Sequence, residues 1–290
     1  MSVNSMSSKK ELARALGTNP RELDLILNRL PRFYRPKKVP KKDGNLRTLL
    51  IPDGRLKEIQ RGIRSAIFSS LRWPSSVQGG VRGRSVRTNA AHHVGKPLVV
   101  SVDVKDFFPS VTPKRVFSIF ARLGATAEVA GILTKLTTWN HQLPQGAPTS
   151  TDLANLALAR VDTRIAGFCR QHGFAYSRYV DDITVSGALR LTKFKNLLLR
   201  IIQEEGFMVK AEKTEIMPAD TRQLVTKVVV NRQINLPKEK RQQLRIEAIE
   251  EGSPKPSPSL KGRIDWLGYL NPEAADKILR RARRARRADE

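Results

Sequence analysis

The stretch Tyr179-Val180-Asp181-Asp182 decides the fold, because it sets two adjacent carboxylates between two segments that have strand-like patterns. After the pair, residues 183–187 (Ile-Thr-Val-Ser-Gly) alternate apolar and small side chains, as a return strand does. Since successive side chains of a strand point to opposite faces, both aspartates can share a site only at a turn. The sequence therefore predicts a β-hairpin with Asp181 and Asp182 at its tip.

A third carboxylate follows another predicted strand. Residues 97–102 (Pro-Leu-Val-Val-Ser-Val) have the pattern of a buried strand that leads directly into Asp103. Three carboxylates at the ends of neighbouring strands could hold two Mg²⁺ ions roughly 3.5–4 Å apart, the arrangement used for in-line phosphoryl transfer. Burying three like charges together without cations would be strongly unfavourable. The trio therefore predicts two Mg²⁺ ions as its cofactor, and the alternative is an exposed hairpin tip that binds no metal.

The charge balance indicates a polyanionic partner. The 290 residues include 53 Lys and Arg against 27 Asp and Glu, a net charge of +26. This excess is atypical of a metabolic enzyme and favours nucleic acid as the partner; a solvated basic face is the alternative. The length allows two or three subdomains with cores of their own.

Cysteine, histidine and hydropathy exclude several classes of protein. The single Cys169 rules out an internal disulfide framework, and four histidines leave no plausible zinc cluster. The first ten residues are polar, without the apolar core of a signal peptide, and no apolar stretch approaches the roughly 20 residues of a membrane span. We expect a soluble, cytoplasmic protein with no membrane partner.

The order of the expected elements predicts an α+β fold, with helices on one face of an antiparallel sheet. A hairpin with an Asp-Gly turn is expected over residues 37–52, a loop over the Gly- and Arg-rich residues 79–95, and a linker over 251–259. Helices are expected over residues 11–16, 21–30, 55–71, 112–123, 126–136, 150–169, 191–205, 237–251 and 272–287.

Five sequence blocks resemble those of reverse transcriptases, in the same order and at similar spacing. They are the hairpin residues 41–47 followed by Pro52, residues 100–108 around Asp103, the Pro-Gln-Gly loop at 143–150, the Tyr-x-Asp-Asp box at 178–182, and Gly206-Phe207 with Lys213-Thr214. The resemblance implies an RNA-directed DNA polymerase with a right-hand fold. Its segments would be N-terminal helices and fingers (1–97), a palm (98–232, with finger-contributing helices within 112–142) and a basic helical thumb (233–290).

The bacterial retron reverse transcriptases are the subgroup that the sequence resembles. Residues 89–93 (Asn-Ala-Ala-His-His) are similar to their Asn-Ala-x-x-His element, and residues 222–231 to their Val-Thr-Gly region, with Lys227 in place of Gly. The resemblance implies a cognate structured noncoding RNA as template and primer, an RNA–DNA hybrid product, and antiphage defence with an effector protein. Group II intron-type and diversity-generating reverse transcriptases are alternatives, as is a noncatalytic RNA-binding scaffold.

The resemblance also assigns roles at the reaction centre. Asp103 and Asp181 would bind the metal ions directly, with Asp182 in support and the backbone carbonyl of Val104 as a further ligand. Phe108 would lie beneath the incoming sugar, where its ring would clash with a 2′-hydroxyl and so select deoxynucleotides. The alternative for Phe108 is a ring buried in the core.

Further residues would bind the deoxynucleoside triphosphate. Gln145 and Gly146 would pack against the base pair and the sugar, unless they form an ordinary turn before a helix. Arg47 would clamp the triphosphate, because a guanidinium offers two donors to phosphate oxygens, and Lys41 is a weaker candidate for the same role. Lys213 would neutralise the leaving pyrophosphate; for both Arg47 and Lys213 the alternative is a solvated surface charge.

The expected RNA contacts lie in two regions and one helix face. Asn89 and His93 would brace an RNA-facing segment, and a hydrogen-bonded structural His–Asn pair is the alternative. Val225, Thr226 and Lys227 are expected to contact the RNA. In the tail, phosphate contacts are expected from Arg280, Arg281, Arg283 and Arg284, with a solvated helix as the alternative. The predicted helix 55–71 carries a basic stripe, Lys57, Arg61 and Arg64, spaced to follow a phosphate backbone.

Overall fold

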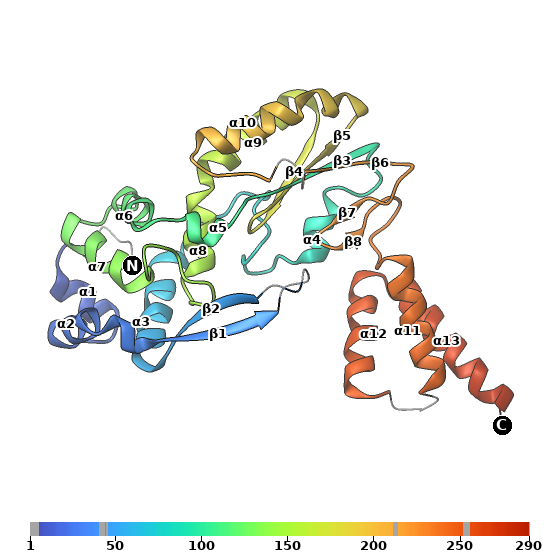
Figure 1. Cartoon of the computed structure of the whole chain (residues 1–290), viewed down its shortest axis with the longest axis horizontal. Coiled ribbons are helices and arrows are strands. Elements are labelled where there is room, and N and C mark those ends of the chain that lie inside the picture. The colour runs from blue at the N-terminus through green and yellow to red at the C-terminus, as the bar shows by residue number, and fades with distance from the viewer. Residues whose placement is uncertain (1–5, 41–43, 45, 211–213, 252–255, 290) are drawn as a thin grey trace. The chain divides into compact units, whose positions relative to one another are not determined.

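The computed structural model describes residues 6–40, 44, 46–210, 214–251 and 256–289, which form two compact units (Figure 1). The first unit comprises Met1–Gly80, Val104–Arg164 and Ile201–Val209; the second comprises Val81–Asp103, Ile165–Arg200 and Lys210–Glu290. Helices α9 (Ala159–His172) and α10 (Lys195–Glu204) each contribute residues to both units. Within the described residues, no helix combines the length and apolar character needed to cross a membrane.

The first unit contains helices and one hairpin, as the sequence predicted. Local signals start the helices: the side chains of Asn19, Asp53, Thr112 and Thr126 each accept a hydrogen bond from a backbone amide in the first turn. The elements are α1 (Lys9–Ala15), α2 (Pro20–Asn28), η2 (Leu30–Phe33), β1 (Tyr34–Pro40), β2 (Leu46–Pro52), α3 (Gly54–Ile63), the π-helical turn η3 (Arg64–Phe68), α5 (Phe107–Ser110), α6 (Pro113–Arg122), α7 (Ala127–Thr137) and α8 (Ser150–Ala157).

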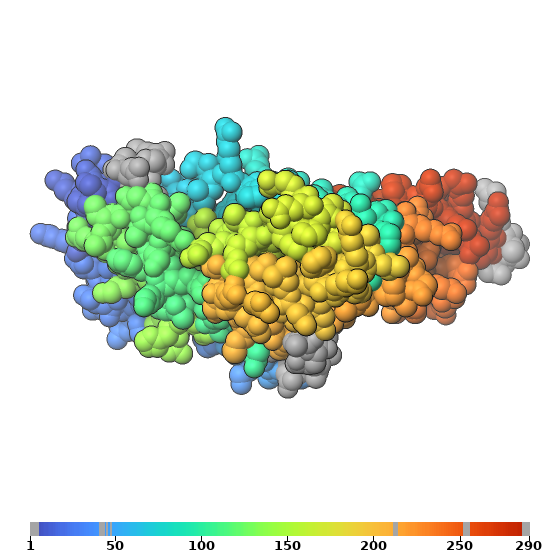
Figure 2. All heavy atoms as spheres, turned by 90° about the horizontal axis from the view of Figure 1, so that it is seen from above, coloured from blue at the N-terminus to red at the C-terminus, as the bar shows by residue number. Residues whose placement is uncertain are grey.

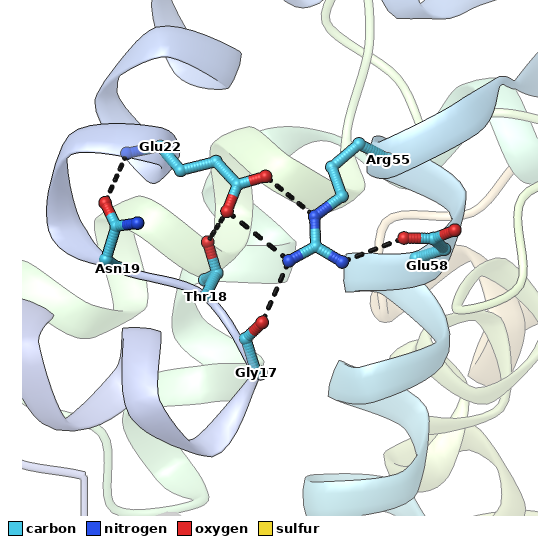
Figure 3. A network of polar contacts seen from close by, with 6 residues as sticks. All are labelled: Gly17, Thr18, Asn19, Glu22, Arg55 and Glu58. Carbon is cyan, nitrogen blue, oxygen red and sulfur yellow. Dashed lines mark hydrogen bonds and ion pairs between the residues drawn. The ribbon is translucent and has the colours of Figure 1, made fainter.

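An arginine connects the start of α2 to the start of α3 (Figure 3). The Arg55 guanidinium donates to the Glu22 carboxylate at 2.7 Å and to the Gly17 carbonyl at 2.8 Å, while its other terminal nitrogen reaches Glu58 at 2.8 Å. Asn19 caps α2 at the backbone amide of Glu22. One side chain thus satisfies three acceptors and fixes the N-terminal helices against the helix that follows the hairpin.

The second unit is built on a four-stranded antiparallel sheet with the strand order β4-β5-β3-β6. Every residue of the Leu98–Val102 stretch is buried except the partly exposed Ser101, which accounts for its nearly continuous apolar sequence. The strands are β3 (Leu98–Asp103), β4 (Ala175–Tyr179), β5 (Asp182–Gly187) and β6 (Glu215–Pro218). The predicted strand before Asp103 and the predicted Asp-Asp hairpin are confirmed.

Three helices at the C-terminal end of the second unit pack around an apolar core that they share with other elements of this unit. Figure 2 shows their side chains, coloured orange to red, in one continuous group. They are α11 (Lys238–Glu250), α12 (Pro258–Leu270) and α13 (Pro272–Asp289), and the small hairpin of β7 (Leu224–Val225) and β8 (Val228–Val229) precedes them. Buried Leu244, Leu267 and Ile278 belong to the same cluster as Val225 and Val228, so the hairpin shares the core of these helices.

The prediction of a loop over residues 79–95 is wrong for the middle of this segment. Residues 86–91 form the helix α4 (Val86–Ala91), which packs against β4. A reciprocal capping box starts this helix: the Ser85 hydroxyl accepts from the Thr88 amide at 3.2 Å, and the Thr88 hydroxyl accepts from the Ser85 amide at 2.7 Å. The two paired amides offset the poor helix propensity of the glycines that precede this helix.

Candidate active site

The sheet register brings the predicted carboxylates together at one end of β3 and β5. Asp103 is the last residue of β3 and lies opposite Asp182, the first residue of β5. Tyr179 also pairs with Asp182, so Val180 and Asp181 form the two-residue turn of the hairpin. Asp103, Asp181 and Asp182 line one cavity of about 540 Å³.

A buried arginine supports the hairpin turn. Val180 has a φ of 61°, a left-handed conformation that is strained for a β-branched side chain. The Arg178 side chain is fully buried and donates from its Nη1 to the Val180 carbonyl at 2.7 Å. No local sequence pattern indicates this role of Arg178, because the role depends on the geometry of the turn.

The pKa of the Asp182 carboxyl is raised above its ordinary value. Burial raises its pKa to about 6, a hydrogen bond from Ser101 lowers it, and the charges of Asp181, Asp103 and Glu215 raise it. The Ser101 hydroxyl donates to Asp182 Oδ1 at 3.1 Å. Glu215, a fourth carboxylate that the sequence did not indicate, pairs with Ser101 across β3 and β6.

The donor chemistry of this cluster suits a hard cation. Carboxylate oxygens are the ligands that Mg²⁺ prefers, and the three aspartates offer nothing softer. Among the side chains that the structure describes, no group of three or more His, Cys, Asp or Glu is already arranged as a metal site. Val104, the expected carbonyl ligand, belongs to the first unit, where it forms an antiparallel bridge with Val209.

The other wall of the carboxylate cavity is cationic and aromatic. Lys227, Lys240 and Trp266 line it, together with Thr226 from the turn between β7 and β8. The cavity therefore combines acidic groups, which suit metal ions, with ammonium groups, which suit phosphates.

A directional chain of hydrogen bonds runs through buried His93. Its Nδ1 lies 2.7 Å from Ser186 Oγ, and its Nε2 lies 2.7 Å from Ser177 Oγ. Because the Ser177 hydroxyl donates to Asn89 Oδ1 at 2.6 Å, it must accept from His93, so we assign the ring proton to Nε2. The Asn89 amide nitrogen then donates to Thr226 Oγ1 at 3.4 Å.

The surroundings of His93 keep it neutral. Burial lowers its pKa to about 3, with smaller contributions from the charges of His92 and Lys96. Asn89 and His93 are both fully buried, and their partners are Ser177 in β4, Ser186 in β5 and Thr226. Ser177 thus joins the side chains of His93 and Asn89, and Asn89 connects them to Thr226.

The first unit contains the second group of predicted site residues. Phe108, Gln145 and Gly146 line a cavity of about 390 Å³ together with Lys57 and Arg61. Phe107 is the ring buried in the core, 2% exposed, whereas Phe108 is half-buried and meets Phe107 edge-on at 5.7 Å. The core position that was the alternative for Phe108 is thus occupied by its neighbour.

Close approach of the backbone fixes the Pro-Gln-Gly loop against the hairpin. The Leu50 amide donates to the Gln145 carbonyl at 2.8 Å. Gly146 has a φ of 112°, and a Cβ at this position would lie 3.6 Å from the Leu50 carbonyl oxygen. The φ, more than the contact, requires glycine here.

The three residues of the predicted basic stripe on α3 and η3 have different surroundings. Lys57 and Arg61 line the cavity with Gln145, whereas the Arg64 guanidinium donates to the buried Asp152 carboxylate at 3.0 Å. Arg64 therefore has a structural partner. The Arg47 side chain, Lys41 and Lys213 lie outside the described residues, and the backbone of Arg47 pairs with Val39 in the β1–β2 hairpin.

The basic tail forms part of a groove between α11 and α13. This groove of about 280 Å³ is lined by Arg281 and by four further basic side chains, Lys238, Arg241, Arg245 and Lys277. Arg280 instead pairs with Asp276 one turn earlier on α13, and Arg283 and Arg284 are exposed.

Comparisons with known proteins identify the family of this chain. The family model described as "Reverse transcriptase (RNA-dependent DNA polymerase)" matches residues 39–269. The retron Mx65 reverse transcriptase of Myxococcus xanthus is 37% identical over 94% of this chain and 71% of its own length. The retron Ec86 reverse transcriptase of Escherichia coli is 30% identical over 91% of this chain and 84% of its own.

A solved structure shares the fold at low sequence identity. A telomerase chain from Candida albicans, solved with a fragment of telomeric RNA, aligns with a TM-score of 0.52 at 10% identity. The alignment covers 75% of this chain and half of the telomerase chain. The polymerase fold of reverse transcriptases, with its antiparallel palm sheet, is thereby supported. The chain belongs to the reverse transcriptase family as an RNA-directed DNA polymerase related to the retron reverse transcriptases.

Proposed function

We propose that this polymerase copies its own structured noncoding RNA into a short DNA that stays linked to RNA, by nucleotidyl transfer at Asp103, Asp181 and Asp182. The observation that carries the proposal is the β3–β5 register, which sets Asp103 opposite Asp182 beside the Asp181 turn. The effector protein and the role in antiphage defence are proposed from the likeness to retron reverse transcriptases alone.

Asp103 and Asp181 would hold two Mg²⁺ ions, with Asp182 in support and the Val104 carbonyl as a further ligand. The ions would activate a primer 3′-hydroxyl and offset charge on the leaving pyrophosphate. Ser101 keeps one Asp182 oxygen oriented by its hydrogen bond, and Arg178 holds the turn that presents Asp181. A bound cation would lower the raised pKa of Asp182, because an opposite charge favours the carboxylate.

The cavity of the first unit would receive the deoxynucleotide. Phe108 would exclude a 2′-hydroxyl, while Gln145 and Gly146 would form the wall against the base pair and sugar. Lys57 and Arg61 supply cations at the same cavity, and we propose that they and Arg47 bind phosphates. Lys213 is proposed to neutralise the pyrophosphate.

The RNA and the hybrid product would follow the basic surfaces of the chain. Residues 1–97, 98–232 and 233–290 are proposed as fingers, palm and thumb. In the thumb, Arg281 belongs to a groove with five basic side chains, which suits a phosphate backbone. Arg283 and Arg284 are exposed and would extend this surface.

The decisive experiment measures deoxynucleotide incorporation on a primed RNA template with Mg²⁺. Replacing Asp181 and Asp182 by Ala should abolish incorporation while leaving RNA affinity within about twofold, because the carboxylates act on the reaction rather than on the strand. Asp220→Ala, which removes an exposed carboxylate from a turn of the same unit, is the matched control and should retain activity. Incorporation by the double variant would contradict the carboxylate assignment.

A further inference from the structure

The pair Gly206-Phe207 takes no part in the proposed reaction, but the Phe207 ring packs against the turn that contains Phe108. Phe207 is 1% exposed, and its ring centroid lies 5.7 Å from that of Phe107. Phe107 in turn meets Phe108 edge-on at 5.7 Å. A single buried ring, Phe107, therefore lies between Phe207 and the ring that is proposed to select deoxynucleotides.

Backbone contacts join the same two segments of the chain. The Lys105 amide donates to the Met208 carbonyl at 2.8 Å, and Val104 forms an antiparallel bridge with Val209. The helix α5 that follows Lys105 has only four residues, and its N-cap residue, Asp106, makes no side-chain capping hydrogen bond. A helix this short is not stable by itself, so packing and these backbone contacts hold the turn in place.

A half-buried arginine of α6 fixes the Phe207 ring. The Arg115 guanidinium lies 4.1 Å from the centroid of this ring, where the aromatic face attracts a cation. Its Nη2 donates to the Glu205 carbonyl at 2.8 Å. Gly206 has a φ of 78°, and a Cβ there would lie 3.0 Å from Arg115 Nη2, so glycine leaves room for the guanidinium. Arg115 thus holds both the ring and the backbone that leads to it.

We propose that Phe207 and Arg115 are positioning residues for sugar selection, because they fix how far the Phe108 ring extends into the cavity that it lines. This inference rests on the proposed function and deepens it: it assigns the strictness of selection to two residues outside the proposed nucleotide contacts. Because protein interiors are close-packed, a void behind Phe107 would allow both rings to move back from the cavity. Selection by a steric clash weakens when the clashing ring moves away.

The ratio of kcat/KM for ribonucleotides to kcat/KM for deoxynucleotides tests the proposal, on a primed RNA template with Mg²⁺. Phe207→Leu removes the supporting ring and should raise this ratio by roughly tenfold, the lower end of what one apolar contact contributes to discrimination. Phe108→Ala should raise it further. Adding Phe207→Leu to Phe108→Ala should then change nothing more, since Phe207 acts through the Phe108 ring. Arg115→Lys keeps a cation over the ring and should stay closer to the wild-type ratio than Arg115→Ala does.

Phe68→Leu is the matched control, because it truncates another buried ring of the first unit, one that stacks on Phe120. It should lower the melting temperature about as much as Phe207→Leu and leave the ratio unchanged. An unchanged ratio in Phe207→Leu, beside a raised ratio in Phe108→Ala, would overturn the positioning role alone. So would an equal rise from Phe68→Leu, since general loosening of the unit would then suffice. An unchanged ratio in Phe108→Ala would overturn the proposed sugar selection and this inference with it.

Discussion

Asp103 and Asp182 are register partners at the end of the β3–β5 ladder, and the hydroxyl of Ser101, two residues before Asp103, donates a hydrogen bond to Asp182. Residues two apart in a strand share a face of the sheet, so Ser101 and Asp103 act on the same side. The geometry of the carboxylates is therefore set by strand pairing. A slip of one residue between β3 and β5 would move Asp103 away from Asp182.

The raised pKa of Asp182 predicts that this carboxyl lowers stability as pH rises. Between its ordinary value of 3.8 and about 6, the folded protein holds a proton on Asp182 that the unfolded chain has released. The free energy of unfolding should thus fall through this window, by at most about 3 kcal/mol at about 1.4 kcal/mol per pKa unit. Urea unfolding of the metal-free protein from pH 4 to pH 7 tests this. Asp182→Asn should remove the decline, and a curve parallel to that of the wild type would contradict the assignment.

The contribution of His93 to stability has the opposite pH dependence. Replacing His93 also tests the hydrogen-bond chain that runs through its ring. Its pKa of about 3 lies below the ordinary 6.5, so the unfolded chain binds the proton first and stability is lost as pH falls from 6.5 toward 3. His93→Gln keeps a donor for Ser177, whereas His93→Asn keeps an acceptor for Ser186 and leaves the Ser177–Asn89 branch without its donor. Each should cost about 1–3 kcal/mol of stability.

Activity distinguishes the two His93 variants. Because the Ser177–Asn89 branch reaches Thr226, we expect His93→Asn to lower nucleotide incorporation more than His93→Gln does, at equal stability. Urea unfolding and incorporation on a primed RNA template are measured together. Equal losses of incorporation in the two variants would mean that His93 serves only to fill the core.

Local signals predicted much of the fold, and long-range pairing explains what was missed. Asn19-Pro20 and Thr112-Pro113 start helices through contacts within one turn, so the sequence alone identifies them. By contrast, Arg64 is paired with Asp152, 88 residues later, and no pattern in the basic stripe indicated this. The support that Arg178 gives Val180 likewise depends on the left-handed turn. Helix α4 could have been found from Ser85 and Thr88, whose reciprocal capping outweighs the local composition.

Phe108 is predicted to select deoxynucleotides. Its ring is half-buried at the wall of the Gln145–Gly146 cavity, so Phe108→Ala should admit ribonucleotides by removing the clash with a 2′-hydroxyl. Because Phe107 is the core ring, the stability cost should stay below the 3–5 kcal/mol typical of a fully buried Phe→Ala change. The ratio of ribonucleotide to deoxynucleotide incorporation is the measurement, with Phe117→Ala on the exposed face of α6 as control. Unchanged sugar selectivity would show that the ring does not contact the substrate.

The two arginines Arg280 and Arg281 are neighbours on α13 but should contribute unequally to RNA binding. Arg281 lines the groove with Arg245, whereas Arg280 pairs with Asp276 on its own helix. Changing both Arg245 and Arg281 to Gln should make the salt dependence of RNA affinity shallower by roughly 1.4–1.8, the value for two phosphate contacts on single or double strands. Arg280→Gln should change the slope by much less, since part of that charge is already neutralised within the helix. Equal changes from Arg280→Gln and Arg281→Gln would mean that the whole helix surface attracts RNA diffusely, without a specific groove.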